Sequence, residues 1–173
     1  MDFFETAKKR RSVRQLKASS AVSNEDVRVM LETAIMAPSA GNTQCARFFV
    51  VRTPELKHRL ATEAGHQIFI EQAPVVIVVA ADLNVVGKGY GERGRNTYAL
   101  QDTAAAVQNM LLAATALGYG ACWIGAFDEA KAAQILDLPE HVRPLAMIPI
   151  GVSAEPGSRV PTRKSVEDVT RFV

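Results

Sequence analysis

The chain has 173 residues and a formal net charge of +2, and 48% of its residues are hydrophobic while 22% are charged. This length and balance predict one globular domain over residues 1–173 with its own core. Only 6% of the residues are aromatic and the basic residues form no long stripe, which disfavours a nucleic-acid-binding protein. No apolar run reaches the roughly 20 residues of a membrane helix, so no membrane partner is expected.

The N-terminus is charged and has no apolar segment of the secretion-signal type. Cys45 and Cys122 form no CxxC pair, and the histidines lack the spacing of a metal site. We therefore expect a reducing, cytoplasmic compartment, no metal, and two cysteines that act as small buried apolar residues.

The first predicted element is a short helix that begins near Phe3 and leads into a basic segment over residues 8–14. That segment holds five cations and one serine. Cations at a helix C-terminus complement the helix dipole, so an ordinary solvated surface is one interpretation. An anion site is the other, because arginine can bind phosphate through two N–H groups and a serine hydroxyl can add a hydrogen bond.

The next part of the chain predicts a helix, a loop and a strand. Ser23 is the expected N-cap of a helix whose apolar residues recur at helical spacing as far as Ile35, and Pro38 ends it. A polar loop over 39–44 then leads into a buried strand at 48–51.

Another helix is predicted to begin at Thr53 with proline at its first position, and Gly65 is its expected C′ residue. A short helical piece follows at 68–72. Residues 75–81 are apolar on both faces, which predicts a central strand. Residues 82–96 are rich in glycine and predict an irregular, flexible lid.

Residues 99–117 predict one long, alanine-rich helix that ends at Gly118, with a main apolar stripe from Leu100 to Leu117. A helix that is apolar almost all round belongs in the core or at a subunit interface. The remaining predicted elements are a strand at 121–124, a helix at 128–136 and a strand at 145–150. Helices and strands are therefore mixed, and the pattern alone leaves the sheet parallel or antiparallel.

Residues 89–94 spell GxGxxG, the pattern of dinucleotide-binding folds. That pattern works as the turn between a strand and a helix, whereas the preceding strand is expected to end near Ala81. We favour a flexible loop here. A Rossmann-type dehydrogenase that binds a nicotinamide without a flavin stays as an alternative.

Four segments, taken in order, resemble the FMN-dependent nitroreductase family over essentially the whole chain. They are Arg10-Arg11-Ser12-Val13-Arg14, Ala37 to Gln44, Trp123 to Phe127, and Arg163 to Val169. The resemblance implies an α+β fold, a three-layer α/β/α sandwich whose central sheet is largely antiparallel. It also implies an intertwined homodimer that binds FMN at the subunit interface.

The resemblance also assigns the flavin contacts, with Arg14 as the candidate for stabilising the reduced flavin. The family's first flavin-binding motif, which contacts the phosphate, the ribityl chain and the pyrimidine edge, is matched by Arg10, Arg11, Ser12 and Arg14. The basic pair that closes on the phosphate is matched by Arg163 and Lys164. Three further groups complete the set. They are the loop residues from the other subunit, Pro38, Ser39, Asn42 and Gln44; one amide, Gln67; and a small-residue segment beside flavin N5, Ile124, Gly125 and Ala126. Ordinary loop polarity is the alternative for the three amides. Many relatives have Pro-Trp where this chain has Cys45-Ala46, which bears on the shape of the substrate pocket.

The function implied is a ping-pong reaction in which NADH or NADPH passes a hydride to flavin N5 and then leaves. An acceptor such as a nitroaromatic or a quinone then takes two electrons in the same place. The alternative is an FMN-binding or FMN-sequestering protein with little turnover. Dehalogenation and flavin fragmentation, known from sister branches, fit less well because the predicted lid is short.

Overall fold

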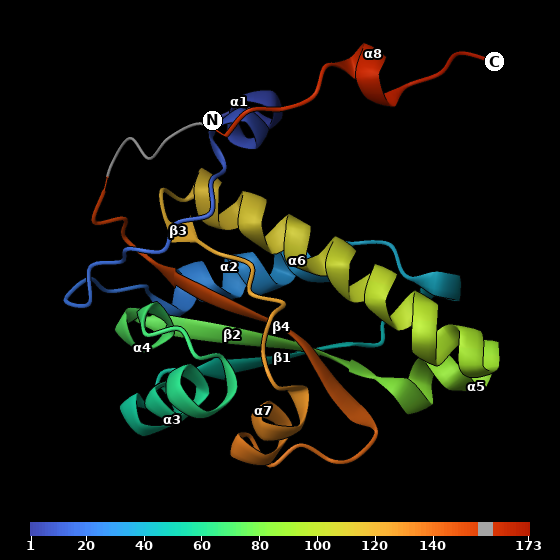
Figure 1. Ribbon diagram of the computed structural model, residues 1–173, viewed down its shortest axis with the longest axis horizontal. Coiled ribbons are helices and arrows are strands. Elements are labelled where there is room, and N and C mark those ends of the chain that lie inside the picture. Colours follow the sequence, from blue (N-terminus) through green and yellow to red (C-terminus); the bar gives the residue numbers. More distant parts are fainter. Residues whose placement is uncertain (156–160) are drawn as a thin grey trace.

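The computed structural model describes residues 1–155 and 161–173, and its helices pack on both faces of a four-stranded sheet (Figure 1). The strands are β1 (Ala46–Val51), β2 (Val75–Asp82), β3 (Gly120–Ala121) and β4 (Val142–Gly151), in the spatial order β1-β2-β4-β3. Each neighbouring pair is antiparallel. This confirms the α+β sandwich and the antiparallel sheet that the family resemblance implies.

The central strand β2 is apolar on both faces because helices cover both faces. Val75, Ile77 and Val79 pack into one core with side chains of α2 and α6, whereas Val76 and Val78 pack into a second core on the other face. The helices of the first layer are α2 (Asn24–Ile35) and α6 (Ala99–Ala116). Those of the second layer are α3 (Pro54–Arg59), the π-helix η2 (Leu60–Ala64), α4 (Phe69–Gln72) and α7 (Glu129–Ile135).

The buried stripe of α6 differs from the predicted one. Leu100 and Leu117 are 43% and 38% exposed, although they were expected to define the inner face. The buried face instead consists of Ala99, Asp102, Thr103, Ala106, Val107, Met110, Leu111 and Ala114. Two polar residues lie on it because their side chains find partners: Thr103 Oγ1 donates to the Ala99 carbonyl at 2.7 Å, and Asp102 accepts a backbone N–H. Gly118, with φ of +88°, follows the helix end as predicted.

The glycine-rich stretch after β2 is helical, which corrects the prediction of an irregular loop. Helix α5 (Leu83–Arg93) begins at Asp82, whose Oδ1 accepts the N–H groups of Asn84 and Val85 at 3.1 Å each. A π-helix, η3 (Gly94–Tyr98), then runs directly into α6. The aspartate N-cap stabilises the start of a helix that glycine content disfavours.

The glycines of α5 and η3 allow close packing. A Cβ on Gly87 would lie 2.7 Å from Arg95 Cζ, and one on Gly94 would lie 2.6 Å from the Val86 carbonyl oxygen. Gly91, with φ of +53°, marks the kink inside α5. The GxGxxG pattern therefore lies within helical structure and does not form a strand-to-helix turn, so the Rossmann-type alternative is wrong.

Three smaller boundaries also differ. The edge strand β3 has two residues, and Ile124 adds only a single bridge to Met147, so the predicted strand at 121–124 is too long. Gly65 has φ of −92°, and the left-handed residue beside it is His66 with φ of +49°. The strand predicted at 145–150 begins earlier, at Val142.

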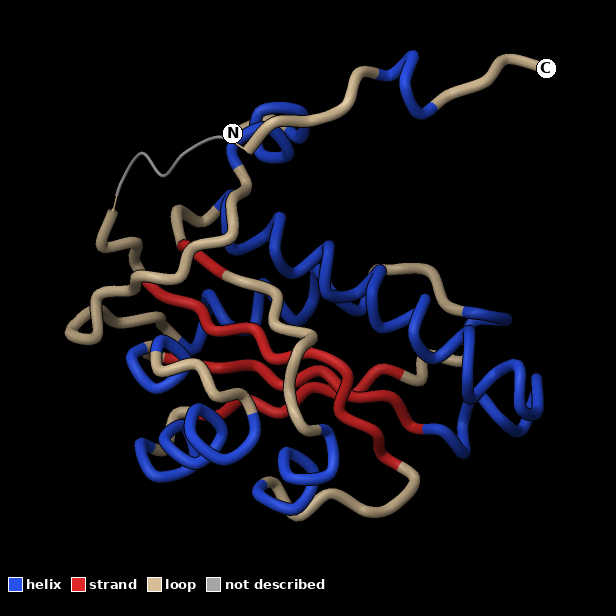
Figure 2. Tube along the Cα trace, viewed as in Figure 1, coloured by secondary structure: helices blue, strands red, loops and turns tan. Residues whose placement is uncertain are grey.

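The two ends of the chain carry short helices, α1 (Phe3–Lys9) and α8 (Val166–Val169). The segment between β3 and α7 is loop and passes across the sheet (Figure 2). Within the residues that the structure describes, no helix combines the length and apolarity needed to cross a membrane.

Candidate functional site

The basic segment after α1 is held against the edge of the sheet. The N–H of Val13 donates to the Ala121 carbonyl at 3.0 Å, and Ser12 forms a parallel bridge with Ala121. Glycine at position 120 permits this approach, since a Cβ there would lie 2.9 Å from Val13 Cβ. The segment is therefore an ordered continuation of the sheet edge and not a tail.

A cleft of about 480 Å³ joins this segment to the C-terminal part of the chain. Its lining consists of Arg10, Arg11, Ser12, Arg14, Pro161, Thr162 and Arg163, and we call it the cationic cleft. The structure thus brings together the two groups that sequence analysis assigned to one phosphate. Lys164 is exposed and does not line this cleft.

The cations of the cleft lie close together without acidic partners. Among residues 1–155 and 161–173, no ion pair involves Arg10, Arg14 or Arg163. The Arg163 guanidinium donates to the Thr162 carbonyl at 3.0 Å, and that of Arg11 to the Arg10 carbonyl at 2.8 Å, but carbonyls do not neutralise charge. Several guanidinium forks and an exposed serine hydroxyl are the donor set that suits a phosphate. The residues present therefore fit the phosphate of an FMN.

Cys122 lies near the cationic cleft as a neutral thiol. Its side chain is buried, and burial raises the pKa of the thiol. The nearby Arg14, Ser12 and Arg10 act on the pKa in the opposite direction. Because burial is the largest effect, the cysteine keeps its proton and adds no negative charge to the cleft. This agrees with its interpretation as a small buried residue.

The small-residue segment 124–126 follows β3 on the face of the sheet that α3 and α7 cover. Ile124 and Met147 exchange two backbone hydrogen bonds of 3.0 Å, which fix the start of the segment, and Gly125 and Ala126 are exposed. The N–H of Asp128 then donates to the Ala64 carbonyl at 3.0 Å.

Gln67 belongs to the same layer. Its N–H donates to the Ala61 carbonyl at 3.0 Å, which places it in the turn that follows η2. The Asp128–Ala64 hydrogen bond ties that turn to the end of the small-residue segment. Backbone hydrogen bonds within one chain thus link the basic segment to β3, and link η2 both to Gln67 and to Asp128.

Residues 38–44, which we call the 38–44 loop, lie against the first half of α6. The N–H of Ala40 donates to Asp102 Oδ1 at 3.0 Å, and the N–H of Gln44 donates to Ser39 Oγ at 3.0 Å. Within the loop, left-handed φ values of +53°, +57° and +51° occur at Gly41, Asn42 and Gln44. A left-handed backbone costs about 1–2 kcal/mol at a non-glycine residue, so these contacts hold a strained conformation.

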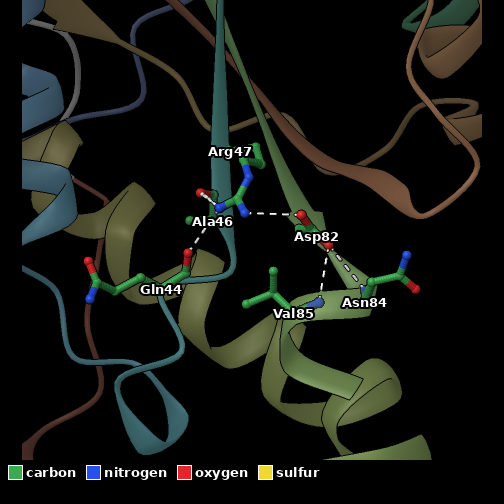
Figure 3. Close-up of polar contacts among 6 residues, drawn as sticks. All are labelled: Gln44, Ala46, Arg47, Asp82, Asn84 and Val85. Atoms are coloured by element: carbon green, nitrogen blue, oxygen red, sulfur yellow. Dashed lines mark hydrogen bonds and ion pairs between the residues drawn. The ribbon is translucent and has the colours of Figure 1, made fainter. Parts of the chain in front are cut away.

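Arg47 ties the end of the loop to α5 (Figure 3). Its Nη1 donates to the carbonyls of Gln44 and Ala46 at 3.0 Å each, and its Nη2 pairs with Asp82 Oδ2 at 3.0 Å. The other oxygen of Asp82 caps α5. One guanidinium therefore joins the loop, β1 and the start of α5.

The 38–44 loop is far from the cationic cleft within one chain. The loop contacts Asp102 near the start of α6, whereas the basic segment contacts Ala121 beyond its end. Helix α6 has 18 residues and is therefore about 27 Å long at 1.5 Å per residue. The structure thus does not bring Pro38, Ser39, Asn42 and Gln44 to the cationic cleft of the same chain.

Two clefts flank the 38–44 loop. One of about 300 Å³ is lined by residues that include Pro38, Gln44, Cys45 and Asp102, and one of about 470 Å³ includes Pro38, Tyr90, Tyr98 and Asp102. Sequence analysis missed Asp102, Arg47 and Tyr90 as neighbours of the loop. An acidic residue inside an otherwise apolar helix is the signal that could have identified Asp102. No comparable pattern marks Arg47.

Comparisons with known proteins agree with this fold and this order of segments. Residues 7–67 and 61–152 match the nitroreductase family. An NADH dehydrogenase of Thermus thermophilus is 31% identical over an alignment of 196 positions, gaps included, that covers 96% of this chain and 95% of that protein. An FMN reductase (NADPH) of Bacillus subtilis is 29% identical over an alignment of 170 positions that covers 91% of this chain and 68% of that protein.

The similarity extends to solved structures. The crystal structure of a nitroreductase family protein from Streptococcus pneumoniae TIGR4 superimposes with a TM-score of 0.90 and is 25% identical. The match covers 99% of this chain and 100% of that one. The chain therefore belongs to the nitroreductase family.

Proposed function

We propose that this chain is an FMN-dependent oxidoreductase that transfers electrons from NAD(P)H to a small acceptor such as a nitroaromatic or a quinone. The family and the names of its relatives support NAD(P)H-dependent oxidoreductase activity. FMN as the cofactor and a nitroaromatic or quinone as the acceptor are what we propose in addition. The observation that carries the cofactor assignment is the cationic cleft. There Arg10, Arg14 and Arg163 meet without an acidic partner among the described residues.

Each group of residues has a distinct task in this proposal. Arg10 and Arg163 hold the phosphate, and the hydroxyl of Ser12 adds a hydrogen bond. When bound, FMN supplies the N5 atom that takes a hydride from the nicotinamide and passes two electrons to the acceptor. The exposed, small residues Gly125 and Ala126 leave room for flat rings to approach within contact distance. Arg14 contributes a cation that favours added negative charge on the bound cofactor.

We also propose that two copies of the chain build each site, with the 38–44 loop supplied by the partner subunit. The separation of the loop and the cleft along α6 supports this arrangement. Large apolar side chains that one chain leaves exposed support it as well: Phe3, Phe4, Ile35, Met36, Val166 and Phe172. A second copy would remove them from water.

A visible absorption spectrum of the purified protein, recorded before and after anaerobic addition of NADH or NADPH, tests the proposal. We expect the bands of oxidised flavin and their prompt bleaching by at least one donor. Flavin bands that persist with both donors would instead favour an FMN-binding protein with little turnover. A protein that contains no flavin and takes up none from added FMN would contradict the cofactor assignment.

A further inference from the structure

We propose that Asp102 is a positioning residue for the flavin site, because its buried carboxylate holds the 38–44 loop in the conformation that the site uses. The inference rests on the proposed FMN-dependent function. Asp102 itself lies on α6 behind the loop, and it acts through the loop without contacting the cofactor.

The first observation is that Asp102 is a buried carboxylate whose partners are both at the loop. The residue is 8% exposed, and among the described residues it takes part in no ion pair. Its Oδ1 accepts the Ala40 N–H at 3.0 Å and its Oδ2 accepts the Cys45 thiol at 3.5 Å. A buried carboxylate without a cation is costly, and these two donors offset that cost only while the loop stays in place.

The second observation is where the two donors lie along the chain. Ala40 precedes the left-handed residues and Cys45 follows them, so one carboxylate bridges both ends of the strained part of the loop. Asn42 and Gln44 would relax from their left-handed conformation if the surroundings did not hold them. Arg47 holds the Gln44 carbonyl from the side of β1 (Figure 3). Asp102 holds the loop from the side of α6.

The third observation is the state of the Cys45 thiol. Burial and the neighbouring charge of Asp102 raise the pKa of Cys45 to about 11. The thiol therefore keeps its proton at neutral pH, and it can serve as the donor in the contact with Asp102 Oδ2.

The last observation is that Asp102 and the loop share the same clefts. Asp102, Pro38 and Ser39 line both the cleft of about 300 Å³ and that of about 470 Å³. A change at Asp102 is thus transmitted to the loop residues that the proposed function places at the flavin of the partner subunit.

The test compares Asp102→Ala with Asn109→Ala as a matched control. Asn109 also lies on α6, and its Nδ2 donates to the Thr33 carbonyl of α2 at 3.2 Å, away from the loop. In FMN-free protein, we expect Asp102→Ala to speed hydrogen–deuterium exchange of the amides of the 38–44 loop about tenfold more than it speeds that of the amides of β2. We also expect it to raise the Kd for FMN about tenfold, since the loop is no longer preorganised. Asn109→Ala should change neither quantity.

Double variants identify the route of the effect. If Asp102 acts through the loop, its effect on the Kd for FMN shrinks in an Asn42→Gly background and stays full in an Arg10→Ala background. Equal effects in both backgrounds would contradict action through the loop. Asn42→Gly is the suitable loop change because glycine adopts the left-handed conformation without strain.

A second substitution keeps the test decisive if Asp102→Ala does not fold. Asp102→Asn preserves an acceptor for the Ala40 N–H but not a charge, so we expect a two- to fivefold rise in loop exchange and in the Kd for FMN. Unchanged loop exchange, or faster exchange with an unchanged Kd, would overturn the inference. A wild-type protein that binds no FMN would overturn the proposed function instead, and the exchange measurement would still report whether Asp102 holds the loop.

Discussion

The cationic cleft and the 38–44 loop are the two halves of the proposed flavin site, and the fold holds them in opposite ways. In the cleft, Ser12 and Arg14 are exposed, and within residues 1–155 and 161–173 the guanidinium groups of Arg11 and Arg163 donate hydrogen bonds only to backbone carbonyls. In the loop, three left-handed residues are fixed by a buried carboxylate and by an arginine that is itself paired with an aspartate.

The two regions therefore make different contributions to the proposed site. The cleft supplies charge, and among the described residues Arg10, Arg14 and Arg163 have no acidic partner. The loop supplies a fixed shape, and the free energy of that shape is part of folding. Changes in the cleft should therefore alter ligand affinity with little effect on stability, whereas changes around the loop should alter stability first.

The largest expected effect is the loss of FMN affinity when the cationic cleft loses charge. Arg10→Ala combined with Arg163→Ala should weaken FMN binding at least about hundredfold, because each charge-assisted hydrogen bond is worth roughly 1.5–3 kcal/mol. The stability of the FMN-free protein should stay within about 0.5 kcal/mol, since neither side chain has an acidic partner among the described residues. Fluorescence titration with FMN and urea denaturation measure the two quantities.

The matched control for this double variant removes the same charge from outside the cleft. Lys9, at the end of α1, and Lys17, three residues after Arg14, are exposed cations that do not line the cleft, so Lys9→Ala with Lys17→Ala should weaken FMN binding only a few-fold. FMN binding that survives in the Arg10 and Arg163 variant to within threefold of wild type would refute the phosphate assignment.

Local patterns in the sequence predict much of this fold. Ser23 caps α2, and the two apolar faces of 75–81 predict a central strand, because both signals depend on neighbouring residues. The helix at 83–93 is missed since Gly87 and Gly94 serve close contacts with Arg95 and Val86, which a count of glycines cannot reveal. Strand direction depends on the whole chain and follows only from the family resemblance.

The residues of the candidate site also fall into two groups, those that the sequence predicts and those that it does not. The basic residues at 10–14 and Arg163 are recognisable as motifs, and the structure places Arg10, Arg11, Ser12, Arg14 and Arg163 around one cleft. Asp102 and Arg47 are not recognisable, because their partners are distant in sequence: Ala40 and Asp102 are 62 residues apart, and Arg47 and Asp82 are 35 residues apart. Only the folded chain shows that they hold the loop.

The two cysteines, one at the end of the loop and one near the cleft, allow the two regions to be compared through the pH dependence of the free energy of unfolding. The pKa of Cys45 is raised from 9.0 to about 11 by burial and by Asp102, so between these values the unfolded thiol ionises while the folded thiol does not. The free energy of unfolding should therefore fall as pH rises from about 9 to 11, and Cys45→Ala should remove about 1–2 kcal/mol of that loss. Urea denaturation at pH 8 and at pH 10.5 measures it.

Cys122 provides the comparison for this experiment. Burial raises the pKa of Cys122 as well. The charges beside the two thiols act in opposite directions, because Arg14 and Arg10 lower the pKa of Cys122 whereas Asp102 raises the pKa of Cys45. Cys122→Ala should thus remove a smaller part of the alkaline loss than Cys45→Ala. Equal changes for the two variants would mean that the charge surrounding each thiol has no influence on its titration.

The smallest expected effect concerns Thr43, whose buried Oγ1 has no hydrogen-bond partner among the described residues. Valine has the same shape without the hydroxyl, so Thr43→Val should raise the free energy of unfolding by about 0.5–1 kcal/mol in FMN-free protein. Thr103→Val is the control, because Thr103 Oγ1 is buried and donates to the Ala99 carbonyl at 2.7 Å, and its loss should lower stability by about 1 kcal/mol. If Thr43→Val also lowers stability, the hydroxyl has a partner in the second subunit. If Thr43→Val raises the free energy of unfolding and Thr103→Val lowers it, the loop carries an unpaired polar group and α6 does not. That result is expected if the shape of the loop serves the flavin site at the expense of stability.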